Sequence, residues 1–409
     1  MTKSLQPSDL ARITTGRAVP IFADDVAACQ TKLHGTIAGR RILVVGGAGC
    51  IGGATIRALI PYQPAALHVV DLSENNLVEM VRELRGSSTN LPVRDFRTLP
   101  LDYGSEIFHR YLLGQEPYDH VLNFAALKHV RSEKEICSVL QMLETNVLKQ
   151  ARLLRWMEEH SPRATYFSVS TDKAANPVNL MGASKRMMEH VMFGLRESRA
   201  MTGEVTSARF ANVAFSDGSL LHSWSIRLSK GQPLAVPRLT RRYFVSVEEA
   251  GQICLLAGLC GRAGHIYIPK FNPEDLRELA PIACRFLEEH GFTPRLCEDL
   301  TEAISGYDED VAAGRYPVLL TPLDTMGEKA YEEFVGDGES VVDVGLPHLE
   351  AVTYRPASRA GIESFLETAH AAIQDATLPL SKSDVIAALA NVISKFHHAE
   401  AKKGLDERF

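Results

Sequence analysis

A buried strand that runs directly into a glycine-rich turn is the feature that most constrains this fold. Residues 41–47 (RILVVGG) form an apolar run that suits a strand covered on both faces, and residues 50–60 (CIGGATIRALI) read as a helix. Between them, Gly46, Gly49 and Gly52 form a GxxGxxG pattern. Glycine permits the tight turn, leaves backbone N–H groups bare for a pyrophosphate, and lets the helix pack close to the strand. The pattern predicts a dinucleotide-binding loop with cofactor contacts from Gly46, Ala48, Gly49, Cys50, Ile51 and Gly52.

An acidic residue ends the second apolar run, residues 67–71 (LHVVD). Asp71 is placed to accept a hydrogen bond from a ribose 2′-hydroxyl, which favours NAD over the 2′-phosphate of NADP. The following LSENN supplies no arginine for that phosphate, so NAD is the expected cofactor. NADP is the alternative if Ser73 and backbone groups accept the phosphate. Further cofactor contacts are expected from Ser73, Asn75, Asp102, Ala125, Ala126, Lys128, Ser170 and Lys185.

Strands and helices alternate along the first half of the chain. The segments that read as strands are residues 41–47, 67–71, 93–102, 120–126, 165–170 and 205–210. The segments that read as later helices are residues 73–84, 106–113, 137–159 and 182–195. This alternation predicts an α/β fold, a doubly wound parallel Rossmann sheet with a smaller C-terminal substrate-binding lobe. The expected parts are an N-terminal extension (1–38), a dinucleotide-binding domain (39–212), mainly a substrate lobe with possible returns to the sheet (213–378), and a C-terminal helical extension (379–409).

Both terminal extensions contain a predicted amphipathic helix. Asp24 or Asp25 is expected to cap a helix that runs through Leu33, and residues 381–396 carry apolar side chains at helical spacing behind a Ser/Asp cap. These apolar faces predict docking on the body or on a second copy of the chain, so a homo-oligomer is expected.

Charge and composition argue against several classes of protein. The net charge of -6 gives no basic surface for nucleic acid, and no apolar run reaches the ~18–20 residues of a membrane span. The N-terminus lacks the apolar core of a signal peptide. Seven scattered cysteines, without a CxxC pair or a His/Cys cluster, predict neither a disulfide framework nor a metal site. A cytoplasmic protein without a membrane or nucleic-acid partner is expected.

Residues 168–185 (SVSTDKAANPVNLMGASK) are the most informative stretch. A buried strand ends in STDK, and a methionine and a lysine follow at the start of the next helix. Asp172 and Lys173 place an acid and a base side by side, which general acid–base chemistry needs. The catalytic residues expected here are Thr171, Asp172, Lys173, Met181 and Lys185.

This stretch resembles STDKAxNPxNxMGxSKR of the nucleotide-sugar 4,6-dehydratases that act on N-acetylglucosamine. They belong to the extended short-chain dehydrogenases and include capsule, flagellin and O-antigen (CapD-like) polysaccharide biosynthesis proteins. FAALKHV, RFANVAFSDGSLL, TRRYFVSVEEA and MGEKAYEEFV resemble further motifs of that family, so the resemblance covers residues 38–336. The terminal extensions, SENNLVEMVREL and KHVRSEKE are similar to a longer subgroup associated with legionaminic-acid-type pathways, whose carrier nucleotide can be GDP.

The resemblance implies loss of water from UDP- or GDP-linked N-acetylglucosamine, giving a 4-keto-6-deoxy sugar for surface-glycan or nonulosonic-acid biosynthesis. A hydride leaves C4 for the nicotinamide and returns to C6. Asp172 would protonate the departing C6 hydroxyl, Lys173 would take the C5 proton, and Thr171 would hydrogen-bond the C4 oxygen. Lys185 would hold the nicotinamide ribose. Met181 replaces the usual tyrosine that accepts the C4 hydroxyl proton, so Lys173, Thr171 or water takes over that step, or the site is inactive.

Substrate contacts are expected from Lys128, His129, Asn212, Ser219 and Arg242, with Asn212 and Arg242 as candidates for the diphosphate. The sequence departs from the family in having Thr325-Met326 where Arg-Pro is common, and Ala211 where glycine is common. The alternative functions are a nucleotide-sugar epimerase of the same fold and a non-catalytic protein that senses a dinucleotide.

Overall fold

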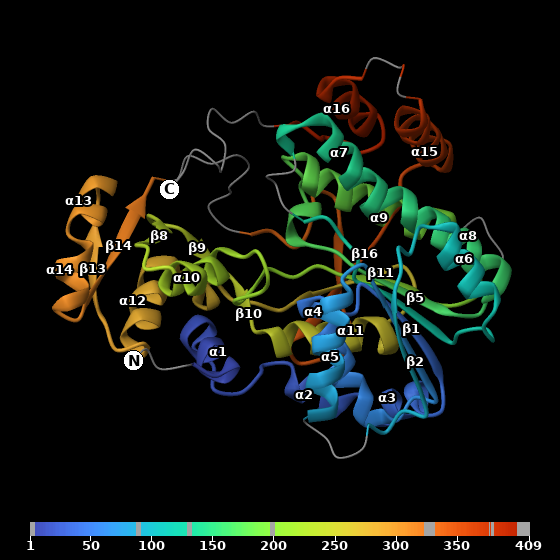
Figure 1. Cartoon of the computed structure of the whole chain (residues 1–409). Coiled ribbons are helices and arrows are strands. Elements are labelled where there is room, and N and C mark those ends of the chain that lie inside the picture. Colours follow the sequence, from blue (N-terminus) through green and yellow to red (C-terminus); the bar gives the residue numbers. More distant parts are fainter. Residues whose placement is uncertain are drawn as a thin grey trace.

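Nine strands form the central sheet of the chain, in the order β15-β16-β11-β6-β5-β4-β1-β2-β3 (Figure 1). The computed structural model describes residues 5–86, 91–128, 133–196, 201–322, 332–375, 377 and 380–398. The strands of the sheet are β1 (Arg41–Val45), β2 (Ala66–Asp71), β3 (Asp95–Pro100), β4 (His120–Asn123), β5 (Thr165–Val169), β6 (Val205–Ala208), β11 (His265–Pro269), β15 (Ser340–Asp343) and β16 (Leu349–Thr353).

Seven of these strands, from β3 across to β11, run parallel, while β16 pairs antiparallel with β11 and β15 antiparallel with β16. The chain crosses from the β1–β2–β3 half to the β4–β5–β6 half, so the strand order reverses between β1 and β4. In doubly wound sheets ligands bind beyond the carboxyl ends of the strands at such a point. The predicted α/β class with a parallel sheet is confirmed.

Helices cover both faces of the sheet (Figure 1). Alternation along β1 shows why its run is continuously apolar: Ile42 and Val44 are buried in one cluster, and Leu43 and Val45 in the other. The first face carries α2 (Ala23–Ala28), α3 (Gln30–Ile37), α4 (Cys50–Leu59), α5 (Glu74–Gly86) and α11 (Val247–Cys260). The second carries α6 (Glu106–Leu113), α7 (Ile136–Leu143), α8 (Lys149–His160), α9 (Leu180–Arg196), α15 (Arg359–Gln374) and α16 (Lys382–Ala390).

The long helix predicted over residues 137–159 is interrupted in its middle. α7 and α8 are joined by a π-helical segment, η3 (Glu144–Leu148). Within it, the Asn146 side chain accepts from the Leu127 N–H at 2.8 Å and donates to the Leu127 carbonyl at 2.9 Å. The segment therefore fixes the loop that follows β4, at the carboxyl edge of the sheet, and such bulges are frequent at functional sites.

A smaller lobe lies beside the sheet and is built from residues after β6 (Figure 1). Its parallel three-stranded sheet contributes Tyr316 to a core that also contains Trp224 and Phe286. The lobe comprises β8 (Leu234–Pro237), β13 (Thr293–Cys297), β14 (Arg315–Thr321), α10 (Leu220–Ser229), α12 (Leu279–Glu289), α13 (Leu300–Ser305) and α14 (Tyr307–Ala312). Short pairs, β7 (Asn212–Val213) with β10 (Phe244–Val245) and β9 (Arg241–Arg242) with β12 (Arg277–Glu278), connect it to the main sheet.

The N-terminal extension differs from its predicted form. Asp24 and Asp25 do not cap a helix, since both lie in the first turn of α2 behind Phe22, and the helix breaks at Cys29 before α3. A contact with a distant segment explains the difference. Asp25 is fully buried and its Oδ1 accepts a hydrogen bond from the N–H of His348 at 3.0 Å, which holds the extension against the loop before β16.

Apolar faces of both extensions are covered within one chain. Ile13 of α1 (Pro7–Thr15) is buried in the core of the small lobe, and Leu33 of α3 packs in the core of the main sheet. At the other end, Ser381 caps α16 as predicted, and Leu389 and Phe396 are buried. The predicted docking of these faces on the body is what the structure has, and the homo-oligomer stays a prediction. Across the described residues, no helix combines the length and the apolar character needed to cross a membrane.

Candidate active site

A cavity of about 600 Å³ opens beyond the carboxyl ends of β1, β4 and β5. It brings together predicted site residues from seven separate segments of the sequence. Those that line it are Gly46, Gly49, Cys50, Ile51, Gly52, Asp71, Asp102, Ala125, Ala126, Lys128, Ser170, Thr171, Asp172, Lys173, Met181, Lys185, Asn212 and Ser219. Ala48, Ser73, Asn75 and Arg242 do not line it, and His129 and the Thr325-Met326 departure lie outside the described residues.

Two glycines of the loop, Gly46 and Gly52, leave no room for a side chain. Gly46 has a φ of +68°, and a Cβ there would lie 2.5 Å from the backbone nitrogen of Ala125. A Cβ on Gly52 would lie 2.5 Å from the Gly46 carbonyl oxygen. Gly49 is the N-cap of α4 and can offer no side-chain oxygen to the first N–H groups of that helix. These N–H groups therefore suit an anion such as a diphosphate.

Asp71 is fixed by two backbone donors beside the glycine loop. Its Oδ2 accepts from the Ala48 N–H at 3.1 Å and its Oδ1 from the Ser73 N–H at 3.0 Å. The carboxylate thus stays at the end of β2, where a ribose hydroxyl can still donate to it. The Ser73 hydroxyl instead accepts from the N–H of Asn76 at 3.2 Å, at the start of α5.

Asp102 has a partner that the sequence analysis did not identify. The Nζ of Lys149 lies 2.5 Å from Asp102 Oδ2, and Lys149 also lines the cavity. Burial alone would raise the pKa of Asp102, but the Lys149 ammonium and the Gly104 N–H lower it below its usual range. Lys149 directly follows η3, and its helical surroundings in the sequence carry no signal of a site.

The end of β5 positions an acid next to a base. Thr171 is the N-cap of a short 3-10 helix, η4 (Asp172–Ala174), and its hydroxyl donates to Asp172 Oδ1 at 2.6 Å. Lys173 Nζ lies 3.9 Å from the same oxygen. The Asp172 side chain is 7% exposed and that of Lys173 is 41% exposed, so the carboxyl is buried while the ammonium reaches the open cavity.

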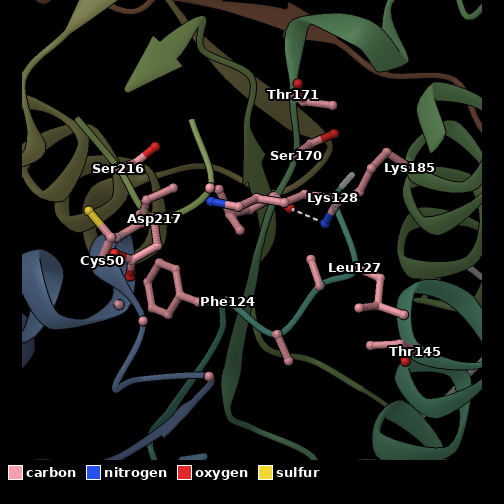
Figure 2. Close-up of a pocket in the computed structure, with 18 of the residues that line it drawn as sticks. Cys50, Phe124, Leu127, Lys128, Thr145, Ser170, Thr171, Lys185, Ser216 and Asp217 are labelled. Carbon is pink, nitrogen blue, oxygen red and sulfur yellow. Dashed lines mark hydrogen bonds between the residues drawn. The ribbon is translucent and has the colours of Figure 1, made fainter. Parts of the chain in front are cut away.

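Lys185 reaches from α9 toward the end of β5, where its Nζ donates to the Val169 carbonyl at 2.9 Å (Figure 2). Complete burial lowers its pKa to about 8. Ser170, next to it on the strand, donates its hydroxyl to Glu189 at 2.6 Å. Lys185 is therefore the cation at the sheet side of the cavity.

Met181 lines the cavity on the first turn of α9 and is buried. Its N–H donates to Glu133 Oε1 at 2.9 Å, so the backbone at this position is fixed. The thioether has no proton to exchange, and the proton acceptor that a tyrosine would supply is therefore missing here.

Lys128 extends across the cavity from the loop after β4 toward Cys50 and Asp217 (Figure 2). Burial and then the Asp217 carboxylate raise the pKa of the Cys50 thiol, while Lys128 lowers it. The lysine places a positive charge close to the glycine loop, where a diphosphate would need one.

Glu332 was not singled out from the sequence either, although it falls in the MGEKAYEEFV segment. Its Oε1 accepts from Asn212 Nδ2 at 2.5 Å and from Arg242 Nε at 3.1 Å. Burial and the nearby Asp172 raise the pKa of Glu332 to about 7, against the opposing effect of Arg242. The two residues expected to contact a diphosphate are therefore both held by one carboxyl group.

Comparison with known families gives one match that covers most of the chain. The family described as "Polysaccharide biosynthesis protein" matches residues 42–353. An uncharacterised membrane protein of Methanocaldococcus jannaschii is 29% identical over 307 residues, which cover 73% of this chain and 81% of that protein. An inverting UDP-N-acetylglucosamine 4,6-dehydratase of Campylobacter jejuni is 24% identical over 278 residues, which cover 66% of this chain and 79% of that protein.

Solved structures share the fold. Pen from Bacillus thuringiensis aligns with a TM-score of 0.63 at 21% identity, covering 79% of this chain and 91% of that one. WbmF from Bordetella bronchiseptica, solved in complex with NAD+ and UDP, aligns with a TM-score of 0.50 at 18% identity, covering 62% and 78%. At these sequence identities, the similarity shows that the fold is shared.

Proposed function

The chain belongs to the polysaccharide biosynthesis protein family, and from this premise we propose that it is an NAD-dependent nucleotide-sugar dehydratase. It removes water from UDP- or GDP-linked N-acetylglucosamine and gives the 4-keto-6-deoxy sugar. The observation that carries the proposal is the Asp172–Lys173 pair, which lines the same cavity as the glycine loop. An epimerase of this fold has no need of an added acid and base at this place.

The residues present fit a nicotinamide dinucleotide. The cavity has bare N–H groups at α4, a fixed carboxylate at Asp71 and a buried cation at Lys185, which suit a diphosphate, a ribose 2′-hydroxyl and the nicotinamide ribose. Bound nicotinamide supplies a hydride acceptor and donor, so that the sugar is oxidised at C4 and later reduced at C6. The Asp71 carboxylate favours NAD over NADP, because it would repel a 2′-phosphate.

Asp172 is the proposed acid for the departing C6 hydroxyl. Its burial and its hydrogen bond from Thr171 keep the carboxyl in one orientation, which a directed proton transfer needs. Lys173 is the proposed base for the C5 proton, which a ketone at C4 makes acidic. The two roles require a protonated carboxyl and a neutral amine, and at a separation of 3.9 Å the proton can be exchanged between them through one water.

Met181 implies that another group accepts the C4 hydroxyl proton. We assign that step to Lys173 as well: its neutral amine accepts the C4 hydroxyl proton and passes it to Asp172 before it takes the C5 proton, and Asp172 then gives the first proton to the departing hydroxyl. Lys185 has its Nζ on the Val169 carbonyl and serves to hold the ribose and to keep the local potential positive.

Incubation of the purified protein with UDP-N-acetylglucosamine and, separately, with GDP-N-acetylglucosamine tests the proposal by mass spectrometry of the product. Loss of one water from either sugar supports a dehydratase and identifies the carrier nucleotide. A product of unchanged mass but altered chromatographic retention would indicate an epimerase. Unchanged substrate in both reactions, with the dinucleotide bound, would favour a protein that senses the cofactor without turnover.

A further inference from the structure

The side-chain amide of Asn212 is held in one orientation. Its Nδ2 donates to Glu332 Oε1 at 2.5 Å and lies 3.5 Å from the carbonyl oxygen of Tyr243. The Tyr243 carbonyl is an acceptor in every state, and Glu332 Oε1 is one when its carboxyl is ionised, so the nitrogen faces them and the oxygen faces away. Asn212 lines the main cavity, and within the described part of the chain no group donates to its Oδ1.

Glu332 is itself fixed. Its side chain is 6% exposed, its Oε1 also accepts from Arg242 Nε at 3.1 Å, and its Oε2 accepts from the Tyr243 N–H at 3.3 Å. Three contacts from two neighbouring segments therefore hold a buried carboxyl group. A buried carboxyl with this set of partners does not rotate away without leaving them unsatisfied.

The consequence is that Asn212 presents an acceptor to the cavity. A phosphate oxygen is also an acceptor, so the two would repel each other, whereas a hydroxyl or an amide N–H would donate to Oδ1. The position of Asn212 supports a contact with the sugar, since Phe210, Ala211 and Val213 beside it line the same cavity as Thr171 and Asp172.

We propose that Asn212 recognises a hydrogen-bond donor on the hexose, a hydroxyl or the acetamido N–H, and that Glu332 is a positioning residue that keeps the amide nitrogen away from the substrate. This inference rests on the proposed function for the identity of the substrate. It replaces the expectation that Asn212 contacts the diphosphate.

Calorimetric titration of the cofactor-loaded protein with a nucleoside diphosphate and with the matching nucleotide sugar separates the two possibilities. The probes are UDP with UDP-N-acetylglucosamine, and GDP with GDP-N-acetylglucosamine. Asn212→Ala is expected to weaken binding of the nucleotide sugar roughly three- to tenfold, the effect of one lost neutral hydrogen bond, and to leave the affinity for the free nucleoside diphosphate unchanged.

Further variants test the role of Glu332. Glu332→Ala frees the Asn212 amide to turn, so it should weaken binding of the sugar nucleotide to the same extent as Asn212→Ala. The double variant should be no weaker than either one, because the two residues act as a unit. Glu332→Gln keeps an acceptor for Asn212 and should recover most of the affinity even if Glu332→Ala folds poorly. Arg241→Ala is the matched control, since the exposed Arg241 pairs with Glu278 rather than Glu332.

Each outcome decides the question. If Asn212→Ala lost the same affinity for the nucleoside diphosphate as for the sugar nucleotide, the contact would lie on the phosphates and the inference would be overturned. If the variant kept its affinity for both ligands, the inference would be overturned as well. Wild-type protein that binds the sugar nucleotide without releasing water would contradict the dehydratase alone, and the binding comparison would still stand. Wild-type protein that binds neither nucleotide sugar would overturn both proposals.

Discussion

Arg209 and Glu189 form a two-pronged ion pair in which both side chains are completely buried. The Nε of Arg209 lies 2.8 Å from Glu189 Oε1, and its Nη2 lies 2.7 Å from Oε2. The Ser170 hydroxyl donates to the same Oε1 at 2.6 Å, and Arg209 Nη1 also pairs with Glu339 at 2.6 Å. One guanidinium thus joins the end of β5, helix α9 and the segment that precedes β15.

Replacing Arg209 with methionine is expected to lower the free energy of unfolding by roughly 3 kcal/mol, the lower end for a broken buried ion pair, because the buried Glu189 and Glu339 carboxylates lose one guanidinium partner while Arg186 stays as a second. Urea denaturation at pH 7 measures this. Arg359→Met serves as control, since the exposed Arg359–Glu363 pair should contribute less than about 1 kcal/mol. Similar urea midpoints for the two variants would show that the buried pair does not stabilise the fold.

Gly52→Ala should abolish cofactor binding, while Gly53→Ala should leave it unchanged. A Cβ at residue 52 would meet the Gly46 carbonyl oxygen at 2.5 Å, so the loop would have to open. At residue 53 the nearest atom is the flexible Arg57 Nη1 at 3.5 Å, and alanine also favours the helix. Fluorescence titration with NAD compares the pair. Equal affinities would mean that the loop tolerates a side chain and does not hold the diphosphate.

Lys185→Met should stabilise the cofactor-free protein and weaken NAD binding. Burial lowers the pKa of Lys185 to about 8, so the native state disfavours the charged form. Below pH 8 the lysine is charged in both folded and unfolded chains, and the methionine variant should be more stable by roughly 1–3 kcal/mol.

The difference in stability between Lys185→Met and the wild-type protein should shrink as the pH rises. Between about pH 8 and the ordinary pKa of 10.5, the unfolded chain binds more protons than the folded one. The wild-type protein therefore gains stability relative to the variant as the pH rises through this window. Thermal unfolding of the two proteins from pH 7 to pH 10 provides the measurement. A difference that grows with pH would contradict the lowered pKa.

Lys173→Ala and Asp172→Asn should affect different steps. In heavy water, Asp172→Asn is expected to release water roughly 10²–10⁴-fold more slowly, yet still to exchange deuterium into C5, because the base remains. Lys173→Ala should lose both exchange and water release. Mass spectrometry of the recovered sugar follows both steps, and equal bound cofactor in all proteins confirms folding. Full activity in Lys173→Ala would rule out its role as the base.

The parts of the site that the sequence predicted are those formed by neighbours in the chain. The glycine loop combines strand, turn and helix within a few residues, and Asp172 and Lys173 are adjacent. Each of these local patterns can be recognised from a few neighbouring residues, and residues of all of them line one cavity.

Other parts depend on contacts between distant segments. Glu332 meets Asn212 across 120 positions, and Lys149 meets Asp102 across 47, so neither carboxylate pair leaves a pattern in sequence. The same holds for Asp25, whose role as an acceptor for the His348 N–H overrides its propensity to cap a helix. The π-helical segment η3 likewise arises from tertiary contacts of Asn146 rather than from a break in the apolar periodicity.

The ion pair between Arg209 and Glu339 has a consequence for how this protein folds while it is being synthesised. On a ribosome, Arg209 is synthesised 130 residues before Glu339, an interval on the order of 10 s at about 5–20 residues per second. Until β11 (His265–Pro269) is made, β6 has no strand beside it on that side, and until Glu339 is made, one side of the guanidinium lacks a carboxylate. The core around Arg209 therefore stays incomplete until the chain has been made as far as residue 339. A chain cut before residue 339 is expected to stay bound to chaperones rather than fold into a smaller working enzyme.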